Sequence, residues 1–558
     1  TGSGIVHIAP GHGEEDFYAG KKWNLAIFCP VNEEGKFTSQ AKAFEGLKVF
    51  EANDIIIEKL KTDNLLVSKS TIAHSYPHCW RCKNPVIFRA THQWFLKVDF
   101  DNLRAKLIEA ADKVNWFPPN GKERITSMLN LRPDWCLSRQ RYWGTPIMAF
   151  YCKKCNSLQK DYTIIKKWQE RVNLEGSDFW FSEPIEKLLP ENYKCECGSK
   201  EFYKEKDILD VWLDSGVSWY SVIKNKLGQE YYPVDVYLEG SDQHRGWFQT
   251  SLIPSVALNK VPPYKNVITH GFVLDEHGKA MHKSLGNVVS PQEVIDKYGA
   301  DILRLWVALS DYNDDVRISG KLLEGPVDTY RKIRNTFRYL LGNLSDYKPS
   351  KNKINADKLL EFDLYMLTRL FKLSREVSDF YGNFEYRSAM KAINDFCICD
   401  LSSFYLDALK DRLYTMPLDS IERRSAQSVL YEILKSLLIM TSPVLSFTAE
   451  EAWQIFKKDI DPDLSQSVFL NDWPEFSVEV SPLLTEKWNK IMAIREKVLK
   501  LLEDLRQKRE IGSSVEAEVF LKFPEKEFDF FKGSESDMTL AFIVSDCHIE
   551  KDENLNYM

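Results

Sequence analysis

The sequence lacks any run of about 18 consecutive apolar residues, so no membrane-spanning helix is expected. It also lacks a surplus of positive charge, because 74 Lys and Arg residues stand against 81 Asp and Glu residues, a formal net charge of −7. This balance excludes a uniformly basic nucleic-acid-binding protein, although an acidic protein can still carry a local basic face. No internal repeat or low-complexity tract stands out.

The first residues, TGSGIVHIAP, lack an initiator Met, a charged leader and the apolar core of a signal peptide. A Gly-rich turn and a strand-like segment begin at once, and we therefore expect a fragment of a longer protein. The 558 residues suffice for three or four domains, and 44% hydrophobic and 28% charged residues are typical of a folded protein.

The pattern along the chain predicts an α/β fold followed by an α-helical bundle. Residues 1–73 mix short apolar runs, Gly turns and one helix-like patch. Residues 74–318 combine aromatic-rich segments with strands and helices, and 151–205 within them are expected to be an insertion bounded by Cys pairs. Residues 319–480 show apolar residues at helical spacing. A long charged helix and a small strand-bearing unit are expected in 481–558.

Polar and aromatic residues gather at the predicted carboxyl ends of two strands, at 235–240 and 266–275. Ligands bind at such ends in open α/β sheets. The cluster comprises Trp212, Asp214, Glu239, Asp242, Gln243, His244, Trp247 and His270. An apolar pocket rimmed by carboxylates and amides suits a small ligand with a cationic amine. The alternative is that both Trp residues are core and that Ser241 caps a helix.

Two further segments contain residues that could bind a ligand, but their sequence patterns are less specific. Lys283 and Ser284, in GKAMHKSLGN, could meet a phosphate, or the segment could be an ordinary polar turn. His7 and Asp16 flank PGHGEED, which could be a hydrolytic or amine-recognition site or only a Gly-rich turn before a helix.

Eight of the eleven cysteines form four close pairs. Cys152-x2-Cys155 and Cys195-x-Cys197 supply four thiolates on two tight turns, as a tetrahedral zinc site requires, and the alternative is four reduced surface thiols. Cys79 and Cys82 form half of a second site, whose other pair is either outside this chain or nonexistent. For Cys397 and Cys399, in a helix-like segment, we expect plain core packing.

Taken together, several segments resemble the isoleucyl-tRNA synthetases of class I, and the resemblance covers essentially the whole chain. The matching segments are GSGIVHIAPGHGEEDF, HSYPHCWRC, RPDWCLSRQRYWGTPI, DVWLDSG, YLEGSDQHRGWF and THGFVLDEHGKAMHKSLGN. The resemblance implies the second half of an editing domain in 1–73, the second half of a Rossmann-type catalytic domain in 74–318, and an anticodon-binding bundle in 319–480. It implies the start of a C-terminal junction domain in 481–558.

The function implied by the resemblance is ATP-dependent attachment of isoleucine to tRNA(Ile) through an isoleucyl-adenylate, with Mg2+ and with hydrolytic editing of mischarged valine. A cytoplasmic monomer without membrane contact is expected. The alternatives are a valyl-type relative and a non-catalytic tRNA-binding fragment.

Site residues follow from the same resemblance. GKAMHKSLGN is similar to the family's KMSKS loop, where Ala280 and His282 stand in place of lysine and serine. The expected ATP contacts are Met281, Lys283 and Ser284, and Lys283 and His270 are the expected catalytic residues. The expected adenylate contacts are Glu239, Gly240, Asp242, Gln243 and His270, with Trp212 and Trp247 as walls of the isoleucine pocket.

The resemblance also places tRNA and editing residues. Arg139 and Arg141 are expected at the tRNA acceptor end, and Arg331, Arg334 and Arg338 at phosphates. In the editing piece, Asp16 is expected to hold the substrate ammonium and His7 to bound the pocket. The family's HIGH motif, Thr-rich editing peptide and C-terminal zinc module are not found, so we expect the chain to carry half of each active site.

Overall fold

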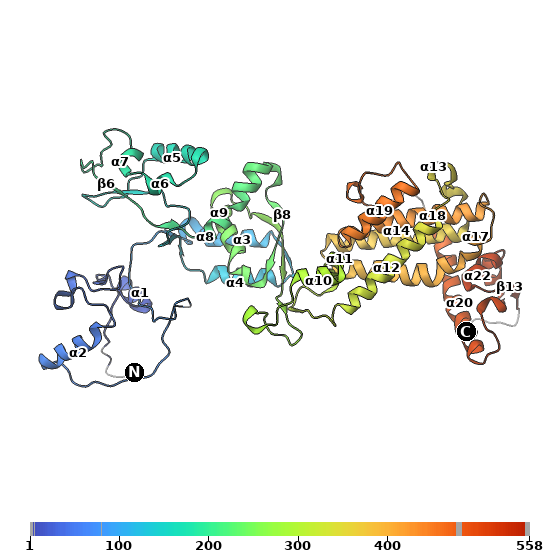
Figure 1. Cartoon of the computed structure of the whole chain (residues 1–558), viewed down its shortest axis with the longest axis horizontal. Helices are drawn as coiled ribbons and strands as arrows, with labels where there is room; N and C mark the ends of the chain where they lie inside the picture. Colours follow the sequence, from blue (N-terminus) through green and yellow to red (C-terminus); the bar gives the residue numbers. More distant parts are fainter. Residues whose placement is uncertain (1–3, 5, 80, 476–481, 553–558) are drawn as a thin grey trace. The chain divides into compact units, whose positions relative to one another are not determined.

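The computed structural model describes residues 4, 6–79, 81–475 and 482–552, apart from the side chain of Ser284. The chain folds into two compact units (Figure 1). The first joins residues 1–106 to 130–218, and the second joins 107–129 to 219–558. The four domains expected from sequence stay a prediction. No helix within the described ranges is long and apolar enough to cross a membrane.

The N-terminal part of the first unit is mostly irregular. Its elements are α1 (Glu14–Lys22), η1 (Ser39–Phe44) and α2 (Ala52–Thr62), and α2 coincides with the predicted helix. The strand expected around His7 is absent from the described residues of this part, where only isolated bridges such as Val31 with Phe37 occur. An extended segment becomes a strand only where another strand pairs with it.

Three two-stranded pairings organise the rest of the first unit: β1 (Phe95–Leu96) with β3 (Trp135–Cys136), β4 (Ser138–Arg139) with β7 (Ile208–Leu209), and β5 (Phe150–Cys152) with β6 (Phe202–Lys204). Short helices complete it: η2 (Phe100–Asn102), α6 (Phe179–Ser182), α7 (Ile185–Leu188) and α8 (Val211–Gly216).

The insertion at 151–205 contains a helix that sequence inspection did not anticipate, α5 (Tyr162–Glu175). Asp161 caps its start by accepting a hydrogen bond from the N–H of Thr163 at 2.9 Å, and Gly176 follows its end with φ +83°. Trp168 on this helix packs with Phe150, Trp180 and other buried aromatics. The antiparallel β5–β6 pairing closes this core and brings the two Cys pairs together.

The second unit contains a parallel sheet of three strands in the order β2 (Asn115–Phe117), β9 (Tyr264–His270) and β8 (Val234–Gly240). The register pairs Gly240 with His270, so both strands end at the same edge. The helices that flank the sheet in sequence are α3 (Leu103–Asp112), α4 (Gly121–Asn130), η3 (Trp219–Leu227), η4 (Gln229–Tyr231), η5 (Ser241–His244) and α9 (Trp247–Asn259).

The predicted strand 266–275 is interrupted at Gly271. A Cβ at this position would lie 2.3 Å from the backbone of Asp314, so the chain at 313–315 packs directly on the glycine. Beyond the break, β10 (Val273–Leu274) pairs with β11 (Val316–Arg317). Helices α10 (Pro291–Tyr298) and α11 (Ala300–Leu309) follow, with η6 (Lys283–Leu285) between strand and helices.

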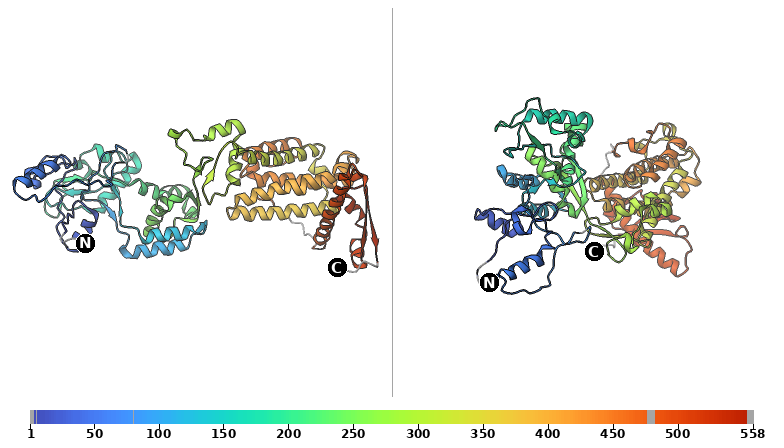
Figure 2. Two further views of the ribbon diagram at one scale, coloured as in Figure 1. Left: turned by 90° about the horizontal axis from the view of Figure 1, so that it is seen from below. Right: turned by 60° about the vertical axis from the view of Figure 1, so that its left-hand side comes forward.

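The α-helical bundle forms as expected (Figure 2). Its long helices are α12 (Glu324–Asn343), α14 (Glu361–Gly382), α15 (Tyr386–Asp395), α18 (Ile421–Thr441), α19 (Ser446–Asp459) and α20 (Pro482–Gln507). Helix α18 is the central one, because its side chains from Ser425 to Thr441 are almost all buried. Shorter elements are α13 (Pro349–Asn352), η7 (Ala356–Lys358), η8 (Phe396–Tyr405), α16 (Leu406–Ala408), α17 (Lys410–Tyr414) and η9 (Val468–Leu470).

The segment NDFCICDLSSFY is a π-helix, η8, rather than a regular α-helix. Cys397 is buried there, as expected, and burial raises the pKa of its thiol to about 12. Cys399 is exposed, so core packing is wrong for this residue. The wider turn of a π-helix changes which side chains share a face.

A small C-terminal module packs on α20. It consists of η10 (Ser514–Glu516), β12 (Glu518–Phe523), α21 (Glu525–Phe531), α22 (Glu535–Phe542) and β13 (Asp546–Lys551), with β12 and β13 parallel. The strand-bearing unit expected in 481–558 is therefore confirmed by β12 and β13. Phe523, Phe531 and Phe542 are buried and join the core of the bundle.

Helix α22 packs against α20 and carries Asp537, whose carboxyl group makes the stability of the protein depend on pH. Burial raises the pKa of Asp537 to about 6, the Glu361 carboxylate adds to the shift, and Lys487 opposes it. Because the folded pKa exceeds the unfolded value of about 4, the stabilisation from this group is complete below about pH 4 and is lost as pH rises through about 6. Asp537→Asn should therefore raise the free energy of unfolding by about 3 kcal/mol at neutral pH.

Denaturant unfolding of the wild-type and Asp537→Asn chains between pH 4 and pH 7 measures the difference in their free energies of unfolding. Near pH 4 the Asp537→Asn chain should match the wild type. Exposed Asp379 offers a control, since Asp379→Asn should change little at any pH. A constant gain from Asp537→Asn at every pH would show that the carboxylate does not titrate as described.

Candidate adenylate, metal and tRNA sites

Three of the expected adenylate residues meet at the carboxyl ends of β8 and β9. A Cβ on Gly240 would lie 2.8 Å from the Asp242 carboxylate and 3.7 Å from Cε1 of His270, so both side chains flank the glycine. His270 Nδ1 lies 2.8 Å from the carbonyl oxygen of Gly271. Because a carbonyl only accepts, Nδ1 carries a proton in this arrangement and Nε2 remains available to a ligand. Glu239 is exposed and accepts a hydrogen bond from the Gly240 N–H at 3.0 Å.

Gln243 and Trp247 have structural contacts as well. The Gln243 side chain accepts a hydrogen bond from the Trp247 N–H at 3.0 Å at the start of α9, and it donates to Asp242 at 3.1 Å. The Trp247 ring stacks on Tyr237 with centroids 4.0 Å apart and an interplanar angle of 9°. This stack builds an aromatic wall beside the strand ends, and Tyr237 was not anticipated from sequence.

Trp212 belongs to the first unit and is 41% exposed on α8. Its backbone N–H donates to Asp210 at 3.3 Å, and the same buried carboxylate accepts from Trp135 Nε1 at 3.0 Å and from Arg139 at 2.8 Å. The Arg139 guanidinium also donates to two backbone carbonyls, whereas Arg141 is exposed. Asp210 is thus the organising residue of this region. The Asp before a helix is a capping signal that could have revealed it.

The loop that carries Lys283 is held by two polar residues that sequence reasoning missed. Asp275 is buried and accepts hydrogen bonds from the N–H groups of His277 and Lys279 and from Asn287. The Asn287 amide and the two backbone N–H groups lower the pKa of Asp275. Met281 packs against the Val294–Trp306 cluster. Lys283 is exposed, and the expected Ser284 side chain lies outside the described residues.

The two expected editing residues differ in their surroundings. Asp16 lies in the first turn of α1 and accepts a hydrogen bond from the Ala9 N–H at 3.0 Å. This contact closes the Gly-rich turn, which matches the alternative interpretation of the segment. His7 is exposed. An editing role for either residue stays a prediction.

The four cysteines of the insertion converge as predicted. Their sulfur atoms all lie within 4.8 Å of one another, with Cys152 to Cys197 at 3.5 Å and Cys155 to Cys195 at 3.6 Å. Tetrahedral zinc with sulfur at about 2.3 Å separates its ligands by about 3.8 Å, so the spacing fits a metal ion. Hydrogen bonds from the Ser157 hydroxyl and the Cys197 amide lower the pKa of Cys195 to about 6, which favours a thiolate.

Cys79 and Cys82 lie on a tight turn in which Lys83 N–H donates to the Cys79 carbonyl at 2.8 Å. Backbone N–H groups of Cys82 and Arg81 lower the pKa of Cys79. Within the residues that the structure describes, no third Cys, His, Asp or Glu joins this pair in a metal-sized group. Among the described residues, Cys79 and Cys82 therefore supply only half of a metal site.

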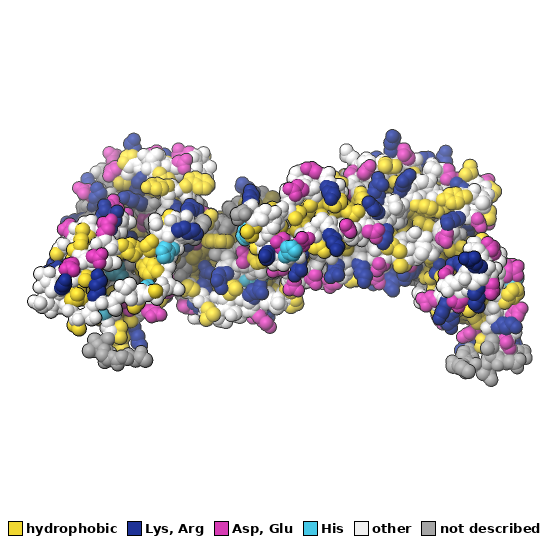
Figure 3. Space-filling view, turned by 60° about the horizontal axis from the view of Figure 1, so that its bottom comes forward, with side chains coloured by type: hydrophobic (Ala, Val, Ile, Leu, Met, Phe, Trp, Pro, Cys, Tyr) yellow, Lys and Arg dark blue, Asp and Glu magenta, His cyan; other side chains and the backbone are white. Residues whose placement is uncertain are grey.

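Helix α12 carries the predicted arginine face. Arg331, Arg334 and Arg338 are exposed and spaced three and four residues apart, which places them along one side of the helix. Over the helical part of the second unit, Figure 3 shows Lys and Arg interspersed with Asp and Glu. A basic stripe on an acidic protein is the arrangement that the charge balance left open.

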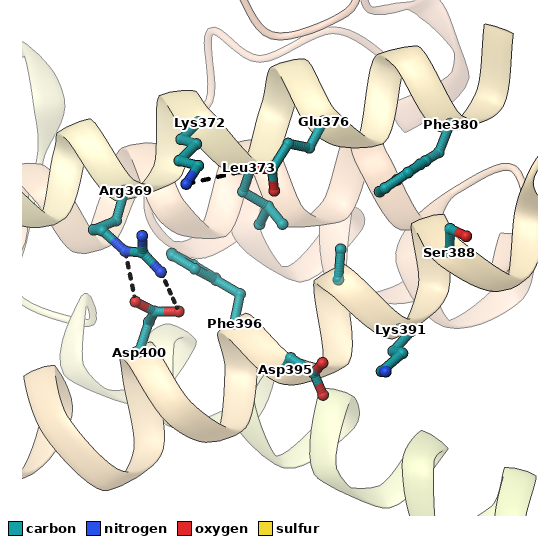
Figure 4. A pocket seen from close by; sticks show the side chains of 11 residues that line it. Arg369, Lys372, Leu373, Glu376, Phe380, Ser388, Lys391, Asp395, Phe396 and Asp400 are labelled. Atoms are coloured by element: carbon teal, nitrogen blue, oxygen red, sulfur yellow. Dashed lines mark hydrogen bonds and ion pairs between the residues drawn. The ribbon is translucent and has the colours of Figure 1, made fainter. Parts of the chain in front are cut away.

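A groove of about 460 Å³ lies between α14 and the α15–η8 segment (Figure 4). The Phe380 ring faces it, and Leu373 and Phe396 supply further apolar surface. Arg369 on α14 pairs with Asp400 on η8 at 2.8 Å. An aromatic face beside charged groups suits the stacking of an unpaired nucleobase.

Comparison with known proteins decides the family. The family described as "tRNA synthetases class I (I, L, M and V)" matches residues 23–319, and the "anticodon-binding domain of tRNA ligase" matches residues 363–521. The chain belongs to the class I tRNA synthetases. The resemblance inferred from sequence and the predicted fold class are thereby confirmed.

Curated relatives agree with this assignment. The isoleucine–tRNA ligase of Petrotoga mobilis is 49% identical over 94% of this chain and 57% of its own length. That of Thermotoga maritima is 49% identical over 93% of this chain and 57% of its own length. The chain thus spans about 57% of the length of these class I relatives. A solved Mycobacterium tuberculosis methionyl-tRNA synthetase bound by methionyl-adenylate is 16% identical with TM-score 0.47, covering 70% of this chain and 68% of that one.

Proposed function

We propose that the protein containing this chain attaches isoleucine to tRNA(Ile) through an isoleucyl-adenylate formed from ATP and Mg2+. The supporting observation is 49% identity to isoleucine–tRNA ligases over 94% of the chain. The convergence of Gly240, Asp242 and His270 at the strand ends, where α/β folds bind ligands, is consistent with it. A valyl-type relative is the alternative, and a cytoplasmic monomer remains our prediction.

In this proposal the chain supplies positioning and charge. The adenylate is held by Asp242, Glu239 and Nε2 of His270. The Trp247 ring, stacked on Tyr237, forms one side of the pocket for the amino-acid side chain. Lys283 on its exposed loop supplies a cation to the phosphates, while Asp275 and Asn287 hold the loop's shape. Such groups act by orientation and by stabilising charge in the transition state. No covalent enzyme intermediate is needed.

Isoleucine-dependent exchange of pyrophosphate with ATP tests the proposal. For the 558-residue chain alone we expect tRNA binding without adenylate formation, because the family's HIGH motif is not found in it. Joined to the remaining length seen in its relatives, the protein should exchange with isoleucine far better than with valine. Stronger exchange with valine would favour the valyl alternative. Robust exchange by the chain alone would contradict the expected half-site.

The arginine face of α12 gives a quantitative prediction for tRNA binding. Replacing Arg331, Arg334 and Arg338 together by Ala removes three proposed phosphate contacts. The slope of log affinity against log salt concentration should then fall in magnitude by about 2 to 3. Binding of tRNA measured across a salt series checks this.

The matched control replaces the same three arginines by Lys, which keeps the charge and should keep most of the salt slope. An unchanged slope in the triple Ala chain would show that the phosphates lie elsewhere. The groove beside Phe380 would then be the next candidate surface.

We further propose that the four-cysteine cluster binds Zn2+ as a structural ion. Four Cys ligands leave no open position for a substrate, which is typical of structural rather than catalytic zinc. Two of the ligands, Cys152 and Cys195, are buried in the aromatic core of the insertion. The ion would therefore hold β5 and the 195–197 turn together.

A further inference from the structure

The turn between α14 and α15 contains a residue whose backbone conformation is unfavourable for its type. Phe384 has φ +61°, in the left-handed region that favours glycine. Its N–H donates to the Tyr381 carbonyl at 3.1 Å, and the Glu385 N–H donates to the Phe380 carbonyl at 2.8 Å. These two hydrogen bonds define a Schellman motif, whose left-handed position is usually occupied by glycine. A bulky residue persists there only where another interaction offsets the strain.

The Phe384 side chain contacts the three-stranded parallel sheet. Its ring meets the ring of Phe117, the last residue of β2, edge to face, with centroids 4.9 Å apart and an interplanar angle of 74°. Phe117 in turn pairs with Ile268 of β9. Edge-to-face aromatic pairs are favourable beyond the area that they bury. The turn of the helical bundle therefore packs directly on the sheet, where β2 ends.

A series of hydrogen bonds joins the same turn to the end of β9. The Tyr312 hydroxyl donates to the Phe384 carbonyl at 2.8 Å, and the Tyr312 carbonyl accepts from the Gly271 N–H at 2.9 Å. The Gly271 carbonyl lies 2.8 Å from Nδ1 of His270. All of these residues belong to the second compact unit. The bundle is thus connected to the imidazole at the strand end through two intervening residues.

The core of the bundle does not explain the strained conformation. Among the described residues that pack on that core are the neighbours Tyr381 and Tyr386, but not Phe384. The same motif follows α20, where Arg509 also has φ +61° but has an exposed side chain. The strain at Phe384 is therefore offset by its contacts with the sheet and with Tyr312.

We propose that Phe384 is a positioning residue, which uses the helical bundle to hold the carboxyl ends of β2 and β9 in place and thereby fixes the orientation of His270. Only the part played by His270 in binding the adenylate rests on the proposed function. The bracing of the strand ends does not depend on it. A residue that touches no substrate can still matter in this way, because a small misplacement of a contacting group lowers the rate severely.

Hydrogen exchange and imidazole ¹⁵N spectra of the 558-residue chain test the bracing. Phe384→Gly relieves the left-handed strain and removes the ring, so the bundle should melt no earlier than in the wild type. Protection of the Gly271 amide should nevertheless fall about tenfold, because the strand end opens more easily. The His270 resonance, assigned by its loss in His270→Ala, should shift. Unchanged protection at Gly271, or an unchanged His270 resonance, would overturn the proposal.

Three further variants separate bracing from general loosening. Phe384→Tyr keeps the ring and should behave as the wild type. Tyr312→Phe removes the hydroxyl that donates to the turn, and it should lower protection at Gly271 less than Phe384→Gly does. Arg509→Gly is the matched control, because it relieves the same backbone conformation elsewhere in the bundle, and it should leave Gly271 unchanged. Lost protection at Gly271 in Arg509→Gly would contradict a specific role for Phe384.

Isoleucine-dependent pyrophosphate exchange measures the consequence for the reaction, in the protein completed to the length of its relatives. Phe384→Gly should lower kcat about tenfold and change the KM for isoleucine less, and Phe384→Tyr should restore kcat. An inactive wild-type protein would refute the proposed function and leave the bracing of the strand ends supported. A normal kcat in Phe384→Gly despite lost protection at Gly271 would instead refute the positioning of His270.

Discussion

The Cys195→Ser chain is expected to lose its zinc, from about one ion per chain to none, and the 151–205 insertion is expected to unfold. Cys195 is buried beside Phe150 and Phe202, so the metal and the aromatic core share one wall. Structural zinc contributes about 10–16 kcal/mol of binding energy in zinc-finger peptides, which is as large as the whole stability of an ordinary domain. Elemental analysis of the purified chain and thermal unfolding measure the two effects.

Two control variants sharpen this experiment. Cys399→Ser removes an exposed thiol outside the cluster and should keep both zinc and stability. Cys79→Ser should also keep the ion, because Cys79 and Cys82 form only half a site. A wild-type chain purified without zinc, or full zinc retention by Cys195→Ser, would contradict the metal assignment. Zinc loss in Cys79→Ser would instead place the ion at the other pair.

Asp363→Ala should destabilise the helical bundle by about 3–5 kcal/mol. Asp363 is 0% exposed on α14, where it accepts hydrogen bonds from Tyr405 at 2.7 Å and Ser425 at 2.5 Å. Arg412 lies 3.3 Å away and is itself buried. Burial raises the pKa of Asp363, and Arg412 and the two hydroxyls oppose that shift. Removing the carboxylate leaves an uncompensated guanidinium in the core.

The reason for this cost can be tested by a second substitution. If the unpaired charge is responsible, the double variant Asp363→Leu, Arg412→Met has no buried charge left at this position. It should therefore recover most of the free energy of unfolding that Asp363→Ala loses. The pair of half-buried Asp407 with exposed Lys410 is the control, and Asp407→Ala should cost no more than about 1 kcal/mol. Hydrogen exchange of α14 and α18 follows the bundle separately from the rest of the chain. Equal losses from both single Ala variants would contradict the argument.

Much of the fold follows from patterns within short stretches. Apolar residues at helical spacing predicted the helical bundle that contains α14 and α18, and a long charged helix was expected in the part of the chain where α20 lies, because each helix satisfies its backbone internally and buries one face. The strand Val234–Gly240 and its following helix were likewise evident. The paired cysteines predicted a cluster that the structure assembles.

Errors arose where a partner distant in the chain decides the local structure. The segment around His7 has strand-like composition but no pairing strand among the described residues. Gly271 ends β9 early because residue 314 packs on it. The exposure of Cys399 follows from the π-helical turn of η8, which no residue pattern announced.

The amino-acid sequence alone therefore determined the family, the succession of α/β and helical parts, and the residue types at each expected site. Only the tertiary structure revealed Asp210, which joins Trp135, Arg139 and Trp212, and the contact between Phe384 and Phe117. Periodicity and motifs are properties of neighbouring residues, whereas hydrogen-bond partnership and burial depend on which distant segments pack together.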